Sequence, residues 1–472
     1  MATGKALNGK PYAGNPRVRF DEGEVASAAT PRRGSLLYNM NKLITFAAVA
    51  ASAAIPMAAN ALTVTTNGVT WTYSVNNATA KTVTLGTGSG SGNAIGGTGI
   101  SAYAADIPWK FIGESDGEVY TVTKIASSAF SNCTKLTGNL AFPSSVTEIG
   151  GNAFYGCSGL TGLKLGPNIT TIGAWAFLYC PNMVGDISDL TSVTSFGTGN
   201  GPFDGAGDSK GTRKVFGNIR FHPSLKIIPK CMFRDVPISS VTLPESLTSI
   251  GEAAFQNTLM KAIWLKGSVN ISANYGFSDT PLEIFFAGVN TACSYPTTKR
   301  LFGNATTCKA FIPATSTWLQ LDTSNAPGVE KIYYGPGRGV DIVVNAARNE
   351  LTATPTNATR LVTMMEAAPL FREHFGLDTR ISVTNTIDLA GVTITEAMTS
   401  AVTFDRLMFS AKTQAQLNAI LDAFPATTPV SIDPTGLTEN MVIPETYNNV
   451  HVKTVPGVTI KRTVSGLMII VK

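Results

Sequence analysis

The side chains most often used in catalysis are sparse in this chain of 472 residues. Its three histidines, His222, His374 and His451, lie far apart in the sequence. Acid–base and nucleophilic catalysis need a base of suitable pKa beside a nucleophile or a metal. The sequence contains no H-E-x-x-H, no paired C-x-x-C, no G-x-S-x-G and no phosphate-binding P-loop. We therefore predict no catalytic residues, and we interpret His374, between Glu373 and Phe375, as an exposed helix residue rather than a ligand.

Two glycine-rich stretches have some features of ligand-binding loops. Gly86 to Gly92 alternates glycine with serine and threonine, but neither a Lys-Ser/Thr pair nor a clear helix follows, so we expect a flexible loop. The stretch 197–218 contains Asp204 and Asp208, which would suit a cation, yet an ordinary solvated loop explains the same residues. We predict no cofactor and no metal site.

The formal charge of +5 is concentrated near the N-terminus. Residues 1–61 hold seven of the 36 Lys and Arg residues and three of the 31 Asp and Glu residues. The remainder therefore has 29 basic and 28 acidic residues. A balance so close to zero gives no electrostatic reason to expect nucleic acid as a partner.

Residues 40–61 have the parts of a secretory signal peptide. Met40-Asn-Lys42 supplies a basic start, an alanine-rich apolar stretch follows, and Ala59-Asn60-Ala61 matches an A-x-A cleavage site. A transmembrane anchor is the alternative, although the apolar run is short for a span. We expect cleavage after Ala61, with 1–39 an upstream extension and with membrane contact only through the signal peptide before cleavage.

A phenylalanine recurs along the chain at intervals of 22 to 30 residues. Units of this size cannot cover their own apolar side, but stacked units cover one another. Between Leu160 and Asn168 the sequence reads L-x-x-L-x-L-x-x-N, a leucine-rich repeat strand. Gly150, Gly173 and Gly251 each follow an inward isoleucine, where positive φ or close backbone approach is needed. The seven repeated residues are Phe130, Phe154, Phe177, Phe203, Phe233, Phe255 and Phe277.

The sequence around these phenylalanines resembles the BspA-type leucine-rich repeat family. Val146-Thr-Glu-Ile-Gly-Gly-Asn-Ala-Phe154 is one of six clear copies, and Val193-Thr-Ser-Phe196 with Phe203 is a degenerate seventh. The match covers about 120 to 290 and is repeated. Such a resemblance implies a repeat solenoid. It also implies a secreted or surface protein of bacteria that adheres to proteins or cells.

Three of the six cysteines, Cys133, Cys157 and Cys180, lie three residues after a repeated phenylalanine. A fixed repeat position predicts a column of small buried thiols that act as hydrophobic residues. Cys293 and Cys308 lie outside this column. Because disulfides are allowed in an exported chain, these two are the candidates for a disulfide.

The predicted architecture is a β-rich leucine-rich-repeat solenoid of about seven coils plus caps, followed by a separate α+β C-terminal domain. We assign 62–121 to an N-terminal β cap, 122–338 to the solenoid with its C-terminal cap, and 341–472 to the α+β unit of unknown family. Residues 360–368 and 413–424 have helical spacing, whereas 402–409 and 467–471 are strand-like. This unit has no tail long enough to span a bilayer.

When the repeat strands are aligned, one position on each coil is predicted to point its side chain to solvent, so that these side chains form an outward row along the strands' face. Most of its residues are small or hydrophilic, but Trp264 and Phe285 are aromatic and follow an arginine, as in a binding hot spot. Packing of the C-terminal unit over these two aromatics is the alternative. The row comprises Ala141, Lys164, Ser188, Arg220, Thr242, Trp264 and Phe285, of which Lys164, Arg220, Thr242, Trp264 and Phe285 are the candidate binding residues.

The leading hypothesis is an exported, non-enzymatic protein of the cell surface that binds a protein or glycan through its strand face, in adhesion. One alternative is a structural component of the envelope or surface layer, in which the solenoid is a spacer. A second is a secreted hydrolase with its site in 341–472. Abundance in a cell fraction would favour the structural component.

Overall fold

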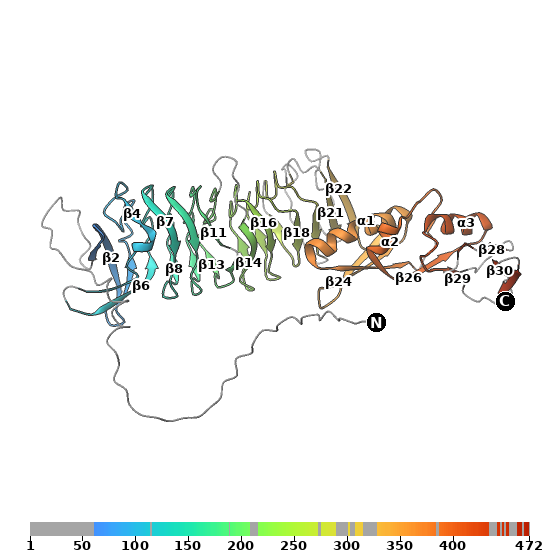
Figure 1. Ribbon diagram of the computed structural model, residues 1–472, viewed down its shortest axis with the longest axis horizontal. Helices are drawn as coiled ribbons and strands as arrows, with labels where there is room; N and C mark the ends of the chain where they lie inside the picture. The colour runs from blue at the N-terminus through green and yellow to red at the C-terminus, as the bar shows by residue number, and fades with distance from the viewer. Residues whose placement is uncertain are drawn as a thin grey trace, which may run out of the picture. The chain divides into compact units, whose positions relative to one another are not determined.

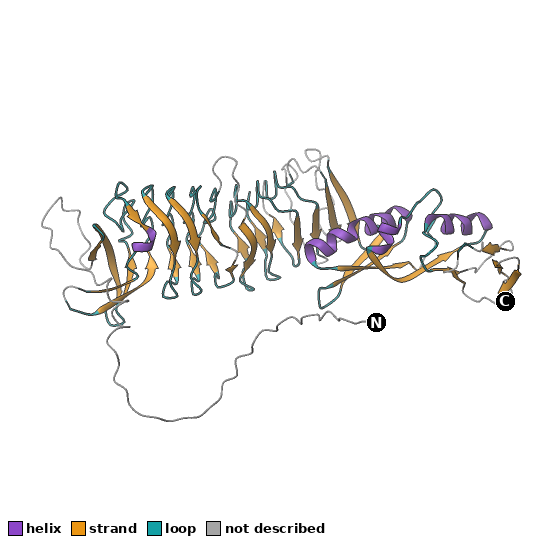
Figure 2. Ribbon diagram, viewed as in Figure 1, coloured by secondary structure: helices purple, strands orange, loops and turns teal. Residues whose placement is uncertain are grey.

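The repeats form stacked coils in the computed structural model (Figure 1). Each coil places one strand on what we call the strand face and a shorter strand on the short-strand face (Figure 2). The structure describes residues 61–113, 116–187, 189–207, 216–271, 275–288, 301–302, 307–314, 328–383, 387–433, 441–443, 446–447, 450–452, 460–464 and 467–471. The predicted signal peptide therefore lies outside the described residues, apart from Ala61.

Neighbouring coils are joined by parallel strand pairs. The strand face consists of three sheets, ordered β4-β7-β9-β11, β12-β14-β16 and β18-β20-β21-β22. Its strands are β4 (Ala102–Tyr103), β7 (Leu136–Ala141), β9 (Leu160–Lys164), β11 (Val184–Asp186), β12 (Asp189–Leu190), β14 (Phe216–Phe221), β16 (Ile238–Thr242), β18 (Ala262–Leu265), β20 (Ile284–Ala287), β21 (Cys308–Pro313) and β22 (Val329–Tyr334). The short-strand face has β6 (Val119–Ile125), β8 (Glu148–Ile149), β10 (Thr171–Ile172), β13 (Ser195–Phe196), β15 (Ile227–Ile228), β17 (Ser249–Ile250) and β19 (Asn270–Ile271).

The seven repeated phenylalanines form one file through the interior, as the spacing predicts. All seven side chains are fully buried. Successive ring centroids lie 5.0 to 5.9 Å apart, with angles between ring planes of 1° to 21°. Because each ring covers the next, the file buries apolar surface that a single coil would expose to water. The degenerate repeat keeps its place, since Phe203 stacks on both Phe177 and Phe233.

The residues before the first repeat cover the exposed end of this file. Strand β2 (Val69–Asn77) pairs antiparallel with both β1 (Ala61–Thr66) and β3 (Thr82–Leu85), and β3 pairs in parallel with β6. A further short strand, β5 (Lys110–Ile112), pairs antiparallel with β6. Trp71 is fully buried and packs edge-on against Phe130 at 6.3 Å. An apolar side chain therefore meets the terminal phenylalanine instead of water.

The predicted column of buried thiols is confirmed. Cys133, Cys157 and Cys180 are fully buried and free of disulfides. The thiol of Cys157 donates to the Phe130 carbonyl at 3.0 Å, and that of Cys180 donates to the Phe154 carbonyl at 3.1 Å. The thiols of Cys157 and Cys180 therefore bond to a carbonyl of the preceding coil while they fill the interior.

The C-terminal residues form an α/β sheet, which corrects the predicted α+β class. Five of its six strands run parallel, and β23 pairs antiparallel at one edge. Helices occupy the connections between parallel strands, which is the βαβ arrangement. The elements are β23 (Val340–Val344), β24 (Glu350–Pro355), α1 (Ala358–Phe375), β25 (Asp378–Val383), α2 (Glu396–Ser400), β26 (Val402–Ser410), α3 (Gln414–Ala423), β27 (Val430–Asp433) and β29 (Val450–Val452), followed by a sheet of β28 (Met441–Ile443), β30 (Ile460–Val464) and β31 (Leu467–Val471).

The last coils and the C-terminal sheet share one apolar core, whereas the sequence predicts two separate units. Phe371 of α1 packs against Phe286 of β20 at 5.3 Å and against Phe311 of β21 at 5.0 Å. One cluster of buried side chains includes Trp264 of β18, Phe311 of β21 and Val450 of β29. Helix α1 therefore covers the end of the strand face.

Candidate ligand-binding cleft

Three of the five candidate binding residues lie on the exposed strand face, as predicted. Lys164, Arg220 and Thr242 have exposed side chains. Arg220 is opposite Thr242 in the parallel pair of β14 and β16, and its guanidinium donates to Asp189 at 3.1 Å. The register places Asp186 opposite Lys164, and Ser188 lies outside the described residues.

The predicted outward position of Phe285 is wrong. Strand β20 pairs with β18 so that Phe285 lies opposite Ile263, and the Phe285 side chain is fully buried. It packs edge-on against Phe277 at 5.8 Å, at the end of the phenylalanine file. The residue opposite Trp264 is Phe286. Since side chains alternate along a strand, a shift of one residue moves a side chain from the outward row into the interior.

Trp264 lies in the outward row, but helix α1 of the C-terminal unit covers it. Its surroundings therefore match the alternative in which the C-terminal unit packs over this residue. Its side chain is 8% exposed. The indole stacks on Phe286 at 5.9 Å, and Phe375 from the last turn of α1 lies 5.7 Å from it. The ammonium of Lys266 lies 4.6 Å from the ring centroid. The aromatic surface is therefore used to hold α1 against the strand face.

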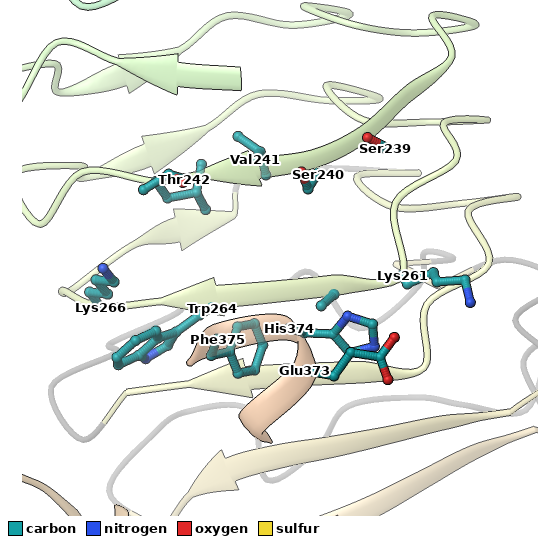
Figure 3. A pocket seen from close by; sticks show the side chains of 12 residues that line it. Ser239, Ser240, Val241, Thr242, Lys261, Trp264, Lys266, Glu373, His374 and Phe375 are labelled. Carbon is teal, nitrogen blue, oxygen red and sulfur yellow. The ribbon is translucent and has the colours of Figure 1, made fainter. Parts of the chain in front are cut away.

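A cleft opens beside this contact, between β16 and β18 (Figure 3). The two strands lie on neighbouring coils but belong to different sheets. The cleft has a volume of about 360 Å³ and is walled on its third side by the last turn of α1. The helix ends there because Gly376 adopts φ of 67°, a left-handed conformation that ordinary side chains disfavour. Val241 is partly exposed at this opening, whereas Ile219 at the same position of the previous coil is fully buried.

A carboxylate joins the helix to the strands at the edge of the cleft. Glu283 accepts from Lys261 at 2.8 Å, and its other oxygen contacts Nε2 of His374 at 3.1 Å. The hydrogen bond from Lys261 lowers the pKa of the Glu283 carboxyl, and the His374 contact acts in the same direction. The side chain of His374 is 11% exposed, so its predicted exposure is wrong. The reason is the docking of α1, which sequence spacing alone does not show.

Two cations lie over the Trp264 ring, and one of them, Lys266, lines the other end of the cleft. Arg348 is 5.9 Å from the ring centroid and its Nε donates to Glu245 at 2.6 Å. Burial lowers the pKa of the Lys266 ammonium, and the nearby Arg348 charge lowers it further. A partly desolvated ammonium beside an aromatic ring is suited to receive an acceptor oxygen from a ligand.

The walls of the cleft offer hydrogen-bonding groups rather than a reaction centre. Ser240 and Thr242 bring hydroxyls from β16, while Lys261 and Glu373 bring opposite charges from β18's coil and from α1. Within the described residues, no group of three or more His, Cys, Asp or Glu side chains could hold a metal ion. No helix in the described part of the chain is long and apolar enough to cross a membrane. Such walls favour binding of a polar ligand.

The structure describes one cysteine of the predicted disulfide and one of the two candidate cation ligands. Cys308 is a free, buried thiol, and Cys293 lies outside the described residues, so the disulfide stays a prediction without structural support. Asp204 is not in a solvated loop, because it is 1% exposed. Arg234 of the next coil donates to both of its carboxylate oxygens, at 2.9 and 2.7 Å. Asp208, the second candidate cation ligand, lies outside the described residues.

Comparison with known proteins identifies the repeats. The family described as "BspA type Leucine rich repeat region (6 copies)" matches residues 119–199 and 212–294. No curated protein matches the chain. Among solved structures, a leucine-rich cell surface protein from Faecalibacterium prausnitzii A2-165 is 18% identical, with 84% of this chain and 96% of that chain covered and a TM-score of 0.39.

Two further solved structures are similar over most of the chain. A leucine-rich repeat protein from Bacteroides ovatus ATCC 8483 is 16% identical, with 81% of this chain and 97% of that chain covered and a TM-score of 0.24. The pneumococcal vaccine antigen PcpA is 13% identical, with 83% and 99% covered and a TM-score of 0.19. Given six matched copies and one continuous phenylalanine file, the repeats at 119–199 and 212–294 are BspA-type leucine-rich repeats.

Proposed function

We propose that this chain is an exported, non-enzymatic binding protein that contacts a protein or glycan at the bacterial cell surface, in adhesion. The observation that carries the proposal is the cleft between β16 and β18, which combines an open strand face with polar groups from three elements. Pockets of this kind fix a ligand through a few placed polar groups. Residues 40–61 support export, because their composition is that of a signal peptide.

The ligand would enter along the exposed row and end in the cleft. Arg220 and Thr242 lie directly beside it on the strand face. The row is hydrophilic, and Asn218 donates to the Thr242 hydroxyl at 3.1 Å, so hydroxyl and amide groups form a continuous polar strip. Hydroxyl-rich ligands and peptide backbones both present matching donors and acceptors. We place the binding face here rather than at the covered Trp264 ring.

The observed contacts do not favour a hydrolase. The one contact between a histidine and a carboxylate in the cleft, His374 with Glu283, joins α1 to the strand face. The described residues place a serine hydroxyl beside a histidine at Ser224 and His222, 2.7 Å apart, but this pair lies in an exposed turn of a single coil. A nucleophile needs a base that is itself oriented by a third group.

The experiment is a binding screen of the folded chain, labelled with a fluorophore, against immobilised glycans, matrix proteins and intact bacteria. Ser240→Tyr fills the cleft and is expected to reduce binding by at least about tenfold, a free-energy change of about 1.4 kcal/mol. Thr171→Tyr, on the short-strand face, is the matched control and should bind as the unmodified chain does. Equal binding by both variants, or no binding by the unmodified chain to any surface, would overturn the proposal.

A further inference from the structure

The backbone ladder of the short-strand face is broken at one place in the described residues. Elsewhere, amides of each coil donate to the coil before it. Thr248, for example, donates to Lys226 at 2.8 Å. Strand β13 ends one sheet and β15 begins the next, although they lie on neighbouring coils. The phenylalanine file continues across the same two coils, since Phe203 and Phe233 stack at 5.7 Å. The coils are therefore in contact inside and separated at β13 and β15. Beside the break they meet again, because Asn200 and Lys230 form a parallel bridge and the Gly201 amide donates to the Lys230 carbonyl at 2.6 Å.

Pro229 explains the break. The equivalent residue is glycine at Gly150, Gly173, Gly197 and Gly251 and alanine at Ala126, and its amide donates to a carbonyl of the strand before it. Gly173 donates to Ile149 at 2.7 Å, and Gly251 donates to Ile228 at 2.9 Å. A Cβ atom built on Gly251 would lie 2.4 Å from the amide nitrogen of Lys230, so a side chain at Gly251 would clash with the preceding coil. Proline has no amide hydrogen and carries a ring. Both properties prevent its coil from closing against β13.

Unused backbone groups remain on both sides of the break. Carbonyls of Thr170 and Ile172 accept from the next coil at 3.0 and 2.9 Å. The equivalent carbonyls of Thr194 and Phe196 receive no such bond from the described residues. The amide of Lys226, which corresponds to Thr248, likewise makes no described bond to the coil before it.

A groove of about 460 Å³ lies at the break and is lined by both strands. Its floor is apolar at Ile227, which is 58% exposed, and at the partly exposed Phe196. Its lining contains Lys226 and Lys230 and no acidic residue. Lys230 pairs with Glu252 at 2.7 Å, while no ion pair of Lys226 is seen among the described residues. The groove is thus an unpaired strand edge with a positive charge at its rim.

We propose that this groove binds an extended, acidic segment of a partner polypeptide, which adds as a strand between β13 and β15. An added strand would satisfy the unused carbonyls and amides, as in other cases in which a peptide joins a sheet edge. A carboxylate on the segment would pair with Lys226, and an apolar side chain would cover Ile227. This site lies on the short-strand face, so it is independent of the cleft beside α1.

The probes are a short peptide of alternating Glu and Val, the same peptide with Lys in place of Glu, and the Glu-Val peptide with alternate amides N-methylated. The full chain is expected to bind the first and to bind the other two at least about tenfold more weakly. Isothermal titration calorimetry measures the affinities. Failure of the Glu-Val peptide to bind, or equal binding of all three peptides, would overturn the proposal.

Pro229→Gly tests the cause of the opening. It restores an amide and removes the ring, so we expect the ladder to close, hydrogen exchange at Lys226 and Ile227 to slow, and peptide affinity to fall by at least about tenfold. Lys226→Glu should also weaken the Glu-Val peptide without moving Tm, and Lys164→Glu on the strand face is its matched control. Unchanged peptide affinity in both Pro229→Gly and Lys226→Glu would contradict the inference.

Discussion

The ring centroids of Trp264 and Phe375 lie 5.7 Å apart, which joins a strand of the repeats to the last turn of α1. The contact lies next to the cleft, because Phe375 also lines it. A residue on the outward row therefore serves as a docking surface for the C-terminal sheet. The geometry of the cleft depends on this docking.

Phe375→Ala should loosen α1 from the strand face. Phe375 is half-buried, so we expect a loss of about 1–2 kcal/mol in the free energy of unfolding, below the range for a fully buried phenylalanine. Trp264 should become more exposed to water, and its fluorescence should shift to the red. The Trp264→Phe variant identifies that signal among the five tryptophans. An unshifted spectrum together with unchanged stability would count against the docking role.

Phe177→Ala should remove a ring from the middle of the file. Its neighbours at 5.3 and 5.6 Å would lose a stacking partner and a cavity would remain. The expected cost is about 3–5 kcal/mol, measured by urea denaturation. Tyr179→Ala, at a side chain that is 55% exposed, is the control and should cost far less. Comparable losses for the two variants would contradict the stacking account.

Arg234→Met should leave the buried Asp204 carboxylate without its cation. Removal of one partner of a fully buried pair costs about 3–5 kcal/mol, whereas apolar replacement of both partners can be neutral. Because the Arg234 side chain is 34% exposed, we expect a loss at the lower end of that range. Burial raises the pKa of the Asp204 carboxyl. The loss should therefore shrink as the pH is lowered, since a protonated carboxyl needs no cation. The double variant Arg234→Met, Asp204→Leu should recover stability, and a double variant no more stable than the single one would refute this.

The buried thiols should make stability fall at alkaline pH. Burial raises the pKa of Cys133 to about 11 and those of Cys180 and Cys308 to about 12. A pKa raised on folding gives stability that is complete below the unfolded value and is lost as pH rises through the folded value. Urea midpoints should be flat from pH 7 to about 8.5 and fall above it.

The same thiols should resist iodoacetamide at pH 8 until the chain unfolds, because the thiolate is the reactive form. Cys293→Ser removes the one cysteine outside the described residues and is the background for this measurement. Rapid alkylation of Cys157 in the folded variant would contradict its burial.

Export predicts a defined mature N-terminus. If 40–61 is a signal peptide, the exported protein should begin at Leu62, because the small residues Ala59 and Ala61 directly precede the expected cleavage site. N-terminal sequencing of the cell-surface fraction tests this. Recovery of residues 1–39 on the exported protein would show that the segment is not an upstream extension.

Repeat spacing predicted the interior well because each side chain there repeats once per coil. Phe130 and Cys133 establish a pattern that Phe154 and Cys157 follow, and stacking turns equal spacing into contact. The helix at 414–423 was likewise predicted from its periodicity, whereas only 360–368 of the helix at 358–375 was predicted.

The outward row was harder to predict, because an error of one residue reverses the face. Phe255 and Phe277 are separated by 22 residues, and the same spacing from Trp264 leads to Phe286 rather than Phe285. The docking of α1 depends on contacts between distant segments, which no local pattern contains. Nor does the sequence show that Asp204 pairs with Arg234, since the pair forms only when neighbouring coils stack.

The break in the backbone ladder had a signal in the sequence, because the repeat alignment places a proline where other coils have glycine. Pro229 aligns with Gly173 and Gly251, where close approach is required. Its consequence, a break in the ladder, could have been predicted from the missing amide alone. The polar cleft had no such signal, because it needs both the separation of β16 from β18 and the wall formed by α1.

The most direct test of the account is hydrogen exchange of the full chain with and without the ligand selected by the binding screen. The account predicts slowed exchange at 239–243 and 261–266, the two sides of the cleft, and no change at 169–173 on the short-strand face. Protection confined to residues away from the cleft, with 239–243 and 261–266 unchanged, would contradict binding through the strand face.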